Sequence, residues 1–312
     1  MRSLRRSAPA LPLLTSLLVA CSEVETGALP GAPEGQQAVS LFGEALFQQE
    51  DTTGAIAEAD AALAADPDNV DLIIAAGRVR RNVWQYRQAM ELYTRAMELA
   101  PDDWRPYRFR GHRHISVRDF ERAIQDLETA RELAPLNWDV AYHLGLAYFL
   151  AGRFDDALTE YLRCLEAADD AEAAEAQAED FRSCSQNRDD PESRVAMTEW
   201  AVRAAARAGR DEEVERLLAA IPLDLELEEN VAYYHDLLHY KGEMTAQELL
   251  NPGPDAPYRR ETVGFGVANW MLARGDTASA LELLEELARD PWWPGFGRIA
   301  AEVELHRLTQ GR

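Results

Sequence analysis

The chain has 312 residues, of which 47% are hydrophobic, and its 55 acidic residues outnumber its 32 lysines and arginines to give a formal net charge of −23. This charge excludes general binding to nucleic acids, which requires a strongly basic surface. The length allows one or two ordinary globular domains, or an array of repeats in which no single large core is needed.

Residues 1–20 have the pattern of a signal peptide. The start MRSLRR is positively charged, and the apolar stretch APALPLLTSLLVA after it is too short to span a bilayer, which takes about 20 apolar residues. The run LVAC at 18–21 matches the lipobox of bacterial lipoproteins, which predicts that Cys21 is lipidated; an ordinary secretory signal with an incidental cysteine is the alternative. Residues 21–35 then form the lipidated cysteine and a flexible tether rich in Gly and Pro.

Small residues recur with a fixed spacing after the tether. A glycine stands every 34 residues, and an alanine follows each glycine twelve residues later. The glycines are Gly43, Gly77, Gly111 and Gly145, and the alanines are Ala55, Ala89, Ala123 and Ala157.

This period and these small positions resemble the tetratricopeptide repeat, a helix–turn–helix unit of 34 residues. Residues 36–171 hold four such units, at 36–69, 70–103, 104–137 and 138–171. The glycines and alanines are small because bulkier side chains would push the paired helices apart. The resemblance implies an all-α fold, a right-handed helical solenoid.

Beyond residue 171 the repeat frame is lost. Residues 172–191 are an acidic, alanine-rich insertion, and residues 192–312 predict degenerate helical pairs that end in a capping helix. The expected helices are 192–208, 211–220, 228–240, 244–251, 262–273, 277–289 and 296–308. Trp292 and Trp293, beside two prolines, are expected to fill the last groove between helices, with partner binding as the alternative.

Two cysteines remain after the lipobox. Cys164 and Cys184 would lie in an oxidising compartment, which favours a disulfide. If residues 154–184 form one helix, however, the twenty residues between the cysteines span roughly 30 Å, whereas a disulfide requires Cα atoms within about 7 Å. We therefore expect no disulfide, although a turn at 169–170 would shorten the distance.

The sequence HDLLH at 235–239 is the sharpest suggestion of an enzyme. Two histidines at i and i+4 share a helix face, and Asp236 stands where a zinc protease carries its glutamate base. No third metal ligand is evident nearby, and the flanking residues continue the helical pattern. We expect no metal, no cofactor and no catalytic site here, and interpret His235 and His239 as packing or surface residues.

The order of these parts resembles the NlpI-type lipoproteins of Gram-negative envelopes. The resemblance rests on the lipobox, the repeats, a degenerate pair, HYKGEMTAQELL at 239–250 and the final repeat ARGDTASALELLEELA. It implies a non-catalytic adaptor on the outer membrane that faces the periplasm, because Ser22 rather than Asp follows the cysteine. The implied partners are peptidoglycan hydrolases or a periplasmic protease, with a homodimer possible, and the insertion near 167–188 departs from the pattern.

Basic residues concentrate in the second and third units. Residues 78–122 hold eleven arginines and six acids. In tetratricopeptide arrays the first helix of each unit lines the concave groove, and its inner positions here are Arg78, Arg81, Asn82, Arg105, Arg108, Phe109, His112, Tyr142 and His143. His114 falls on a packing position, so the sequence His112-Arg113-His114 is interpreted as part of a repeat and not as a metal site.

These inner residues, expected to be mostly exposed, suit an extended peptide with acidic groups or a C-terminal carboxylate. The alternative is a solvated basic face without a ligand. The sequence thus predicts a lipid-anchored scaffold for protein binding. A zinc hydrolase and a structural envelope protein without a ligand are the rival functions.

Overall fold

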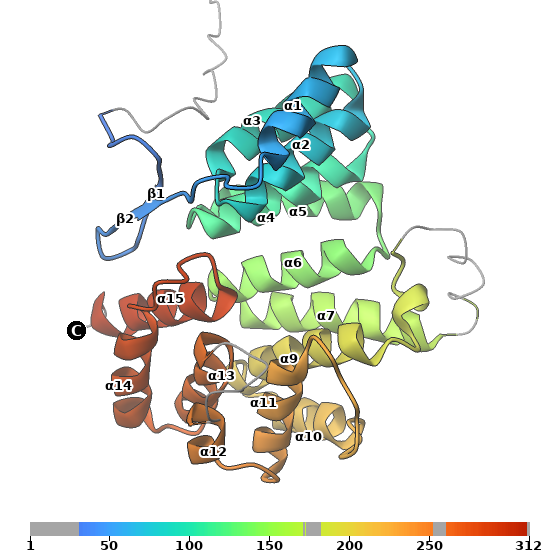
Figure 1. The fold of residues 1–312 in the computed structure, drawn as a ribbon. Helices are drawn as coiled ribbons and strands as arrows, with labels where there is room; N and C mark the ends of the chain where they lie inside the picture. The colour runs from blue at the N-terminus through green and yellow to red at the C-terminus, as the bar shows by residue number, and fades with distance from the viewer. Residues whose placement is uncertain (1–30, 171, 173–181, 252–259, 311–312) are drawn as a thin grey trace, which may run out of the picture.

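The computed structural model describes residues 31–170, 172, 182–251 and 260–310, and these are mostly helical (Figure 1). The elements in chain order are β1 (Gln36–Val39), β2 (Ala45–Phe47), α1 (Ala55–Ala65), α2 (Val70–Asn82), α3 (Tyr86–Leu99), α4 (Trp104–Ser116), α5 (Phe120–Leu133), α6 (Trp138–Leu150), α7 (Phe154–Asp169), the short 3-10 helix η1 (Ser185–Asn187), α9 (Pro191–Arg207), α10 (Asp211–Ala219), α11 (Val231–Lys241), α12 (Ala246–Leu250), α13 (Arg260–Ala273), α14 (Thr277–Leu287) and α15 (Phe296–Gln310). The expected signal peptide, Cys21 and most of the acidic insertion lie outside the described residues.

Successive helices pack as pairs, α2 with α3, α4 with α5 and α6 with α7, and each pair packs on the next. The pairs α9–α10 and α13–α14 continue the arrangement towards the C-terminus (Figure 1). The predicted all-α solenoid of helical pairs is confirmed. In the described part of the chain, none of the helices has both the length and the apolar character that crossing a membrane requires.

A polar cap begins each repeat at the same place. Asn69, Asp103 and Asn137 stand 34 residues apart and accept hydrogen bonds from backbone N–H groups in the first turns of α2, α4 and α6. These N–H groups have no carbonyl partner within the helix, so each cap stabilises its helix by about 1 kcal/mol. Because the caps repeat with the period, equivalent residues of α2, α4 and α6 face the same side.

The repeated glycines lie where two helices cross closely. A Cβ atom on Gly77 would lie 2.5 Å from the ring of Tyr93, and one on Gly145 would lie 2.4 Å from the ring of Tyr161. Both tyrosines are buried at the helix crossing. The expectation that small residues allow the paired helices to approach is confirmed.

The expectation of a helix at the start of the first unit is wrong. Residues 36–47 form an antiparallel hairpin of β1 and β2, in which Val39 pairs with Ala45. Gly43 has a φ of 84° in the turn of this hairpin, a backbone conformation that favours glycine, so its place in the 34-residue frame is a coincidence. Ala38 and Leu46 are buried, which explains why the segment alternates between inward and outward residues.

The hairpin packs on residues from the far end of the chain. The indole N–H of Trp293 donates a hydrogen bond of 2.9 Å to the carbonyl of Phe47. The Trp293 ring lies 5.6 Å from that of Trp84 and 5.3 Å from that of Tyr86. Trp293 therefore fills a space between the hairpin and the second repeat, and not the last groove between helices as expected.

The C-terminal segment crosses the turns inside three successive repeats. Trp84, Arg118 and Gly152 hold equivalent places in these turns, with φ values of 62°, 68° and 79°. Trp84 contacts Trp292 and Trp293, Arg118 pairs with Glu302, and a Cβ atom on Gly152 would lie 3.2 Å from Arg307. The terminal helix α15 packs on α13 and α14, as a cap would, and also lies along this edge of the repeats.

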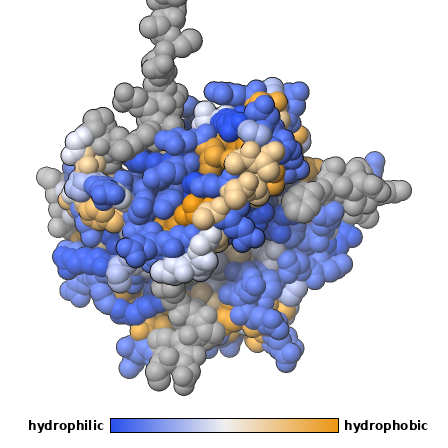
Figure 2. Space-filling model, turned by 45° about the horizontal axis from the view of Figure 1, so that its top comes forward, coloured by the Kyte–Doolittle hydropathy of each residue, from blue (hydrophilic) through white to orange (hydrophobic). Residues whose placement is uncertain are grey.

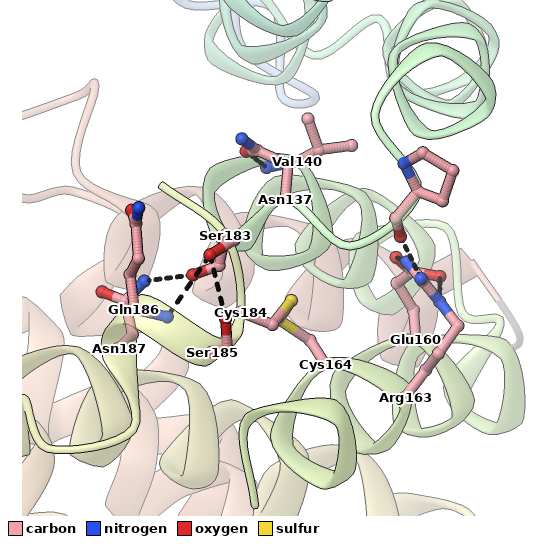
Figure 3. Close-up of a disulfide and its surroundings, with 11 residues drawn as sticks. Asn137, Val140, Glu160, Arg163, Cys164, Ser183, Cys184, Ser185, Gln186 and Asn187 are labelled. Carbon is pink, nitrogen blue, oxygen red and sulfur yellow. Dashed lines mark hydrogen bonds and ion pairs between the residues drawn. A yellow bond between two sulfur atoms is a disulfide. The ribbon is translucent and has the colours of Figure 1, made fainter. Parts of the chain in front are cut away.

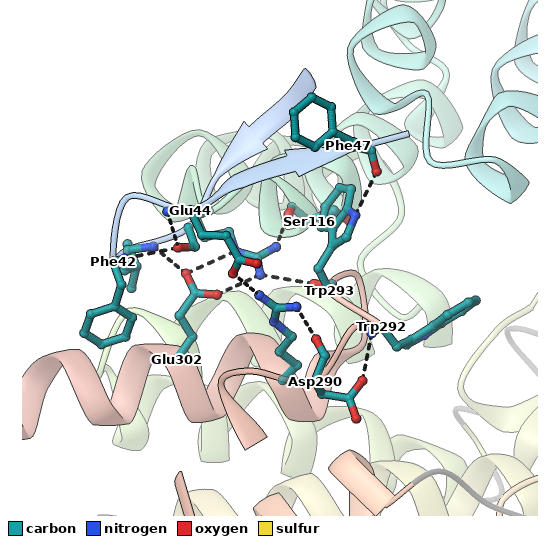
Figure 4. Close-up of polar contacts among 12 residues, drawn as sticks. Phe42, Glu44, Phe47, Ser116, Asp290, Trp292, Trp293 and Glu302 are labelled. Carbon is teal, nitrogen blue, oxygen red and sulfur yellow. Dashed lines mark hydrogen bonds and ion pairs between the residues drawn. The ribbon is translucent and has the colours of Figure 1, made fainter. Parts of the chain in front are cut away.

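Glu302 on α15 joins three parts of the chain (Figure 4). Its carboxylate lies 2.8 Å from Nη2 of Arg118, and both side chains are about 2% exposed or less. The same carboxylate accepts the backbone N–H of Leu41 in the hairpin. Arg118 also donates to the carbonyls of Ser116 and Trp293, so its charge is well satisfied although it is buried.

The expectation of no disulfide is also wrong. Cys164 on α7 and Cys184 are bonded, with Cα atoms 5.4 Å apart (Figure 3). The single long helix does not form, because α7 ends at Asp169 and the chain returns alongside it. The N–H of Cys184 donates to the carbonyl of Leu136, which places Cys184 against the turn before α6.

We predict that Glu302→Gln lowers the free energy of unfolding by about 3–5 kcal/mol, because it leaves the Arg118 charge buried without a counter-charge. Glu213→Gln removes the partner of Arg216 in an exposed pair and should cost about 0–1 kcal/mol. Urea denaturation of both variants measures the difference. Equal losses in the two variants would contradict a special role for Glu302.

Candidate functional site

The predicted binding residues lie on α2, α4 and α6, the first helices of three successive repeats. Arg78, Arg81 and Asn82 are exposed on α2. The other expected residues, on α4 and α6, range from half-buried to buried. The expectation that the set is mostly exposed therefore holds only for α2.

Phe109 lies at the centre of the basic residues. The guanidinium carbon of Arg108 lies 4.8 Å from the centre of the Phe109 ring, and that of Arg78 lies 5.7 Å from it. Tyr93 stacks on the ring as well, at 5.6 Å. Cations over an aromatic face are attracted to its electrons, so Phe109 holds the two arginines close together despite their like charge.

Four arginines around this ring form what we call the arginine cluster, namely Arg78, Arg81, Arg108 and Arg113. Arg113 was not among the predicted residues, because it does not occupy an inner position of the repeat. It is buried, and its guanidinium lies 4.6 Å from the ring centre of Tyr86. Burial, together with nearby Arg81, lowers the pKa of Arg113.

The arginine cluster carries more positive charge than its surroundings neutralise. Arg78, Arg81 and Arg113 have no ion-pair partner among the described residues. Arg108 is 8% exposed, and its nearest carboxylate, Asp139, lies 3.7 Å away. That carboxylate is shared with Arg182, whose Nε lies 2.9 Å from it.

Arg108 is the most constrained member of the cluster. Its Nε is buried and has no hydrogen-bond partner. Burial lowers its pKa to about 10, while Asp139 acts in the opposite direction. An arginine with an unused donor beside uncompensated like charges is arranged to accept an anionic group.

Two histidines form the floor next to the cluster. The rings of His112 and His143 lie 4.3 Å apart, and that of Phe296 on α15 lies 5.2 Å from His112. Burial, with the arginines nearby, holds the pKa of both histidines well below the usual value, so both are neutral at pH 7. The Nδ1 of His143 lies 2.7 Å from the carbonyl of Asp139 and must donate to it, which leaves Nε2 to face Arg108 as an acceptor.

The remaining predicted residues have other contacts. Arg105 lies 2.8 Å from Asp71 and 2.6 Å from Asp103, so its charge is neutralised. Asn82 lies next to Arg81, with 3.4 Å between Oδ1 and the guanidinium. The hydroxyl of Tyr142 lies 3.3 Å from that of Tyr233 on α11 and is directed away from the cluster.

His114 has a structural role, as its packing position predicts. Its side chain is buried, and its ring nitrogens lie 3.7 Å from Asp119 and 3.8 Å from Asp126. The question of a metal site at His112-Arg113-His114 is answered by direction. His114 faces the paired helix, whereas His112 faces His143.

The sequence HDLLH lies on α11, and Asp236 there is fully buried. Its carboxylate lies 2.9 Å from Arg203, which also pairs with Glu199. Nδ1 of His239 lies 2.9 Å from the carbonyl of Met244. In the part of the chain that the structure describes, no three His, Cys, Asp or Glu residues are grouped as metal ligands.

The face shown in Figure 2 is mostly hydrophilic, and its hydrophobic surface gathers near the middle of the view. Phe42 and Phe47 of the hairpin are 51% and 42% exposed. The other hydrophobic side chains with large exposed fractions stand far apart in the sequence. Large apolar areas thus do not explain binding at the arginine cluster, where charge and aromatic rings dominate.

Comparison with known proteins supports the description of the chain as a tetratricopeptide repeat protein. The family model for the tetratricopeptide repeat matches residues 23–70 and 110–173. The small glutamine-rich tetratricopeptide repeat-containing protein 2 of Saccharomyces cerevisiae is 30% identical over 98 residues, which are 31% of this chain and 28% of that relative. The chain therefore matches less than a third of that relative's length.

Solved structures of similar proteins include YrrB, titled a TPR protein with an unusual peptide-binding site, and MamA. YrrB is 14% identical, with a TM-score of 0.41 and coverage of 81% of this chain and 98% of YrrB. MamA is 19% identical, with a TM-score of 0.39 and coverage of 61% of this chain and 88% of MamA. The fold assignment rests on the helical pairs and their period in this chain.

The buried group Arg203, Glu199 and Asp236 predicts a dependence of stability on pH. Burial raises the pKa of Glu199 to about 7 and that of Asp236 well above its usual value, because two carboxylates share one guanidinium. The folded state then binds more protons than the unfolded state between about pH 4.5 and pH 7, and its stability falls as the pH rises through this range.

We expect Asp236→Asn to reduce this fall, which is about 1.4 kcal/mol per pH unit for each extra proton that the folded state binds. Urea denaturation between pH 5 and pH 8 measures it against the unchanged chain. Asp68→Asn, which alters an exposed carboxylate, should leave the slope as it is. The same slope in both variants would show that the buried group does not titrate there.

Proposed function

We propose that this chain is a non-catalytic adaptor that binds an extended acidic segment, or a C-terminal carboxylate, of a partner protein at the arginine cluster. One observation carries the proposal. Arg78, Arg81, Arg108 and Arg113 gather around one aromatic ring, and the single carboxylate near them, Asp139, is shared with Arg182. An anion bound there would supply the missing negative charge.

Exposed and buried arginines divide the work at such a site. Arg78 and Arg81 are exposed, so they meet a partner first and contribute contacts that salt screens. Arg108 and Arg113 are buried, so their field is screened less and acts at short range. Phe109, with Phe296 nearby, adds aromatic surface against which the backbone of an extended segment packs.

We further propose that the adaptor is anchored to the outer membrane through Cys21 and faces the periplasm. The run LVAC and the resemblance to NlpI-type lipoproteins support this location. The same resemblance suggests peptidoglycan hydrolases or a periplasmic protease as partners, and a homodimer as the assembly. A structural envelope protein without a ligand is the rival proposal.

The double variant Arg78→Glu and Arg81→Glu tests the binding site. Affinity capture from solubilised envelopes identifies the partner, and binding of that partner should weaken at least about tenfold, because charge-assisted contacts contribute roughly 1.5–3 kcal/mol each. The melting temperature should hardly change, since both side chains are exposed.

The matched control is Arg122→Glu with Arg153→Glu, which makes the same change of net charge at side chains that are 62% and 46% exposed elsewhere. This control should retain binding. Equal binding by both double variants would remove the arginine cluster from the proposal, and a failure to capture any partner would favour the structural protein.

Cys21→Ser tests the anchor separately. The variant should fold as the unchanged chain does, because the described fold begins beyond the tether, but it should leave the membrane fraction for the soluble fraction. Fractionation of cells followed by detection of the chain measures this. Continued presence of the variant in the membrane fraction would contradict lipidation at Cys21.

A further inference from the structure

A cavity of about 440 Å³ opens between α7, α9, α10 and the turn after α10 (Figure 1). Its floor is apolar and consists of Leu162, Leu165, Val195, Leu217, Ile221 and Leu225. Its volume lies within the range of sites for small molecules, about 300–1,000 Å³. Because α7 and α10 are the second helices of their pairs, the cavity is separate from the arginine cluster on the first helices α2, α4 and α6.

The rim of the cavity is charged, and most of these charges are already paired. Arg194 lies 3.0 Å from Asp169, which also lines the cavity. Arg216 lies 2.7 Å from Glu213 outside it. These two arginines are therefore largely neutralised before any ligand arrives.

Arg188 is different. Its Nε donates a hydrogen bond of 2.6 Å to the carbonyl of Ala168, which fixes the side chain at the rim. Its Nη2 is buried and has no hydrogen-bond partner. Among the described residues, no carboxylate lies within ion-pair distance of it. A fixed cation with an unused donor thus stands at the edge of an apolar cavity.

We propose that this cavity binds a small amphipathic carboxylate, with its apolar body on the leucine floor and its carboxylate on Nη2 of Arg188. A carboxylate satisfies the unused donor, which a purely apolar molecule would leave unpaired at a cost. Asp169, Glu166 and Asp189 at the rim repel a group of higher charge, such as a phosphate dianion. The inference does not depend on the proposed adaptor function.

Titration of the purified full chain with decanoate, below the concentration at which it forms micelles, tests the proposal. Calorimetry should show binding at one site, and decanoate should raise the melting temperature as a ligand of the folded state does. Arg188→Gln should weaken decanoate binding at least about tenfold, while decan-1-ol should bind equally to this variant and to the unchanged chain.

A matched pair of variants locates the site. Ala220 lines the cavity and is exposed at the end of α10, so Ala220→Trp should fold, fill the cavity and abolish binding. Ala219 is exposed next to it and does not line the cavity, so Ala219→Trp should bind decanoate normally.

Three results would overturn the proposal. The first is no binding of decanoate to the unchanged chain, which would leave the cavity to a side chain of a partner protein. The second is undiminished binding to Ala220→Trp. The third is undiminished binding to Arg188→Gln, because the carboxylate would then not lie on that guanidinium.

Discussion

The buried ion pair between Arg118 and Glu302 connects the two ends of the chain. Burial of two charges costs several kcal/mol unless further hydrogen bonds compensate for the lost water. Here the backbone of Leu41 and the carbonyls of Ser116 and Trp293 supply these bonds. Removal of one part leaves charges or polar groups buried without partners, so the hairpin, the third repeat and α15 are held in place together.

This connection changes what the repeats can do. An array of tetratricopeptide units contacts only its neighbours and has two free ends. In this chain α15 crosses the turns at Trp84, Arg118 and Gly152, and two of these residues adopt a left-handed backbone that costs a non-glycine residue about 1–2 kcal/mol. Their side chains make the contacts with the C-terminal segment, so this local strain is offset by the closure of the fold.

Local features of the fold could be predicted from the sequence, because the period places each residue against its neighbours in the next helix. Gly77 against Tyr93 and Gly145 against Tyr161 are such contacts. The hairpin at 36–47, the disulfide of Cys164 with Cys184 and the place of Trp293 depend on segments that meet only after the chain has turned back. A repeat pattern contains no information about these meetings.

The candidate site shows the same division. Positions within the repeat predicted which residues of α2 and α4 come together, since equivalent positions share a face. They did not predict burial, because Phe296 reaches His112 from the other end of the chain and Arg182 reaches Asp139 from beyond α7. Arg113 was missed because its importance comes from the absence of a carboxylate near it, which only the folded chain reveals.

The charge of the whole chain adds a constraint on any partner. With a net charge of −23, the chain repels an acidic partner at long range, and the attraction of the arginine cluster acts only within about the screening length, roughly 8 Å at physiological salt. Moderate salt weakens the repulsion and also the contacts of Arg78 and Arg81, whereas the buried Arg108 and Arg113 are screened less. Affinity at this site therefore depends on the fit of an anionic group against buried arginines and not on electrostatic steering, which favours a partner with one well-placed carboxylate over a generally acidic one.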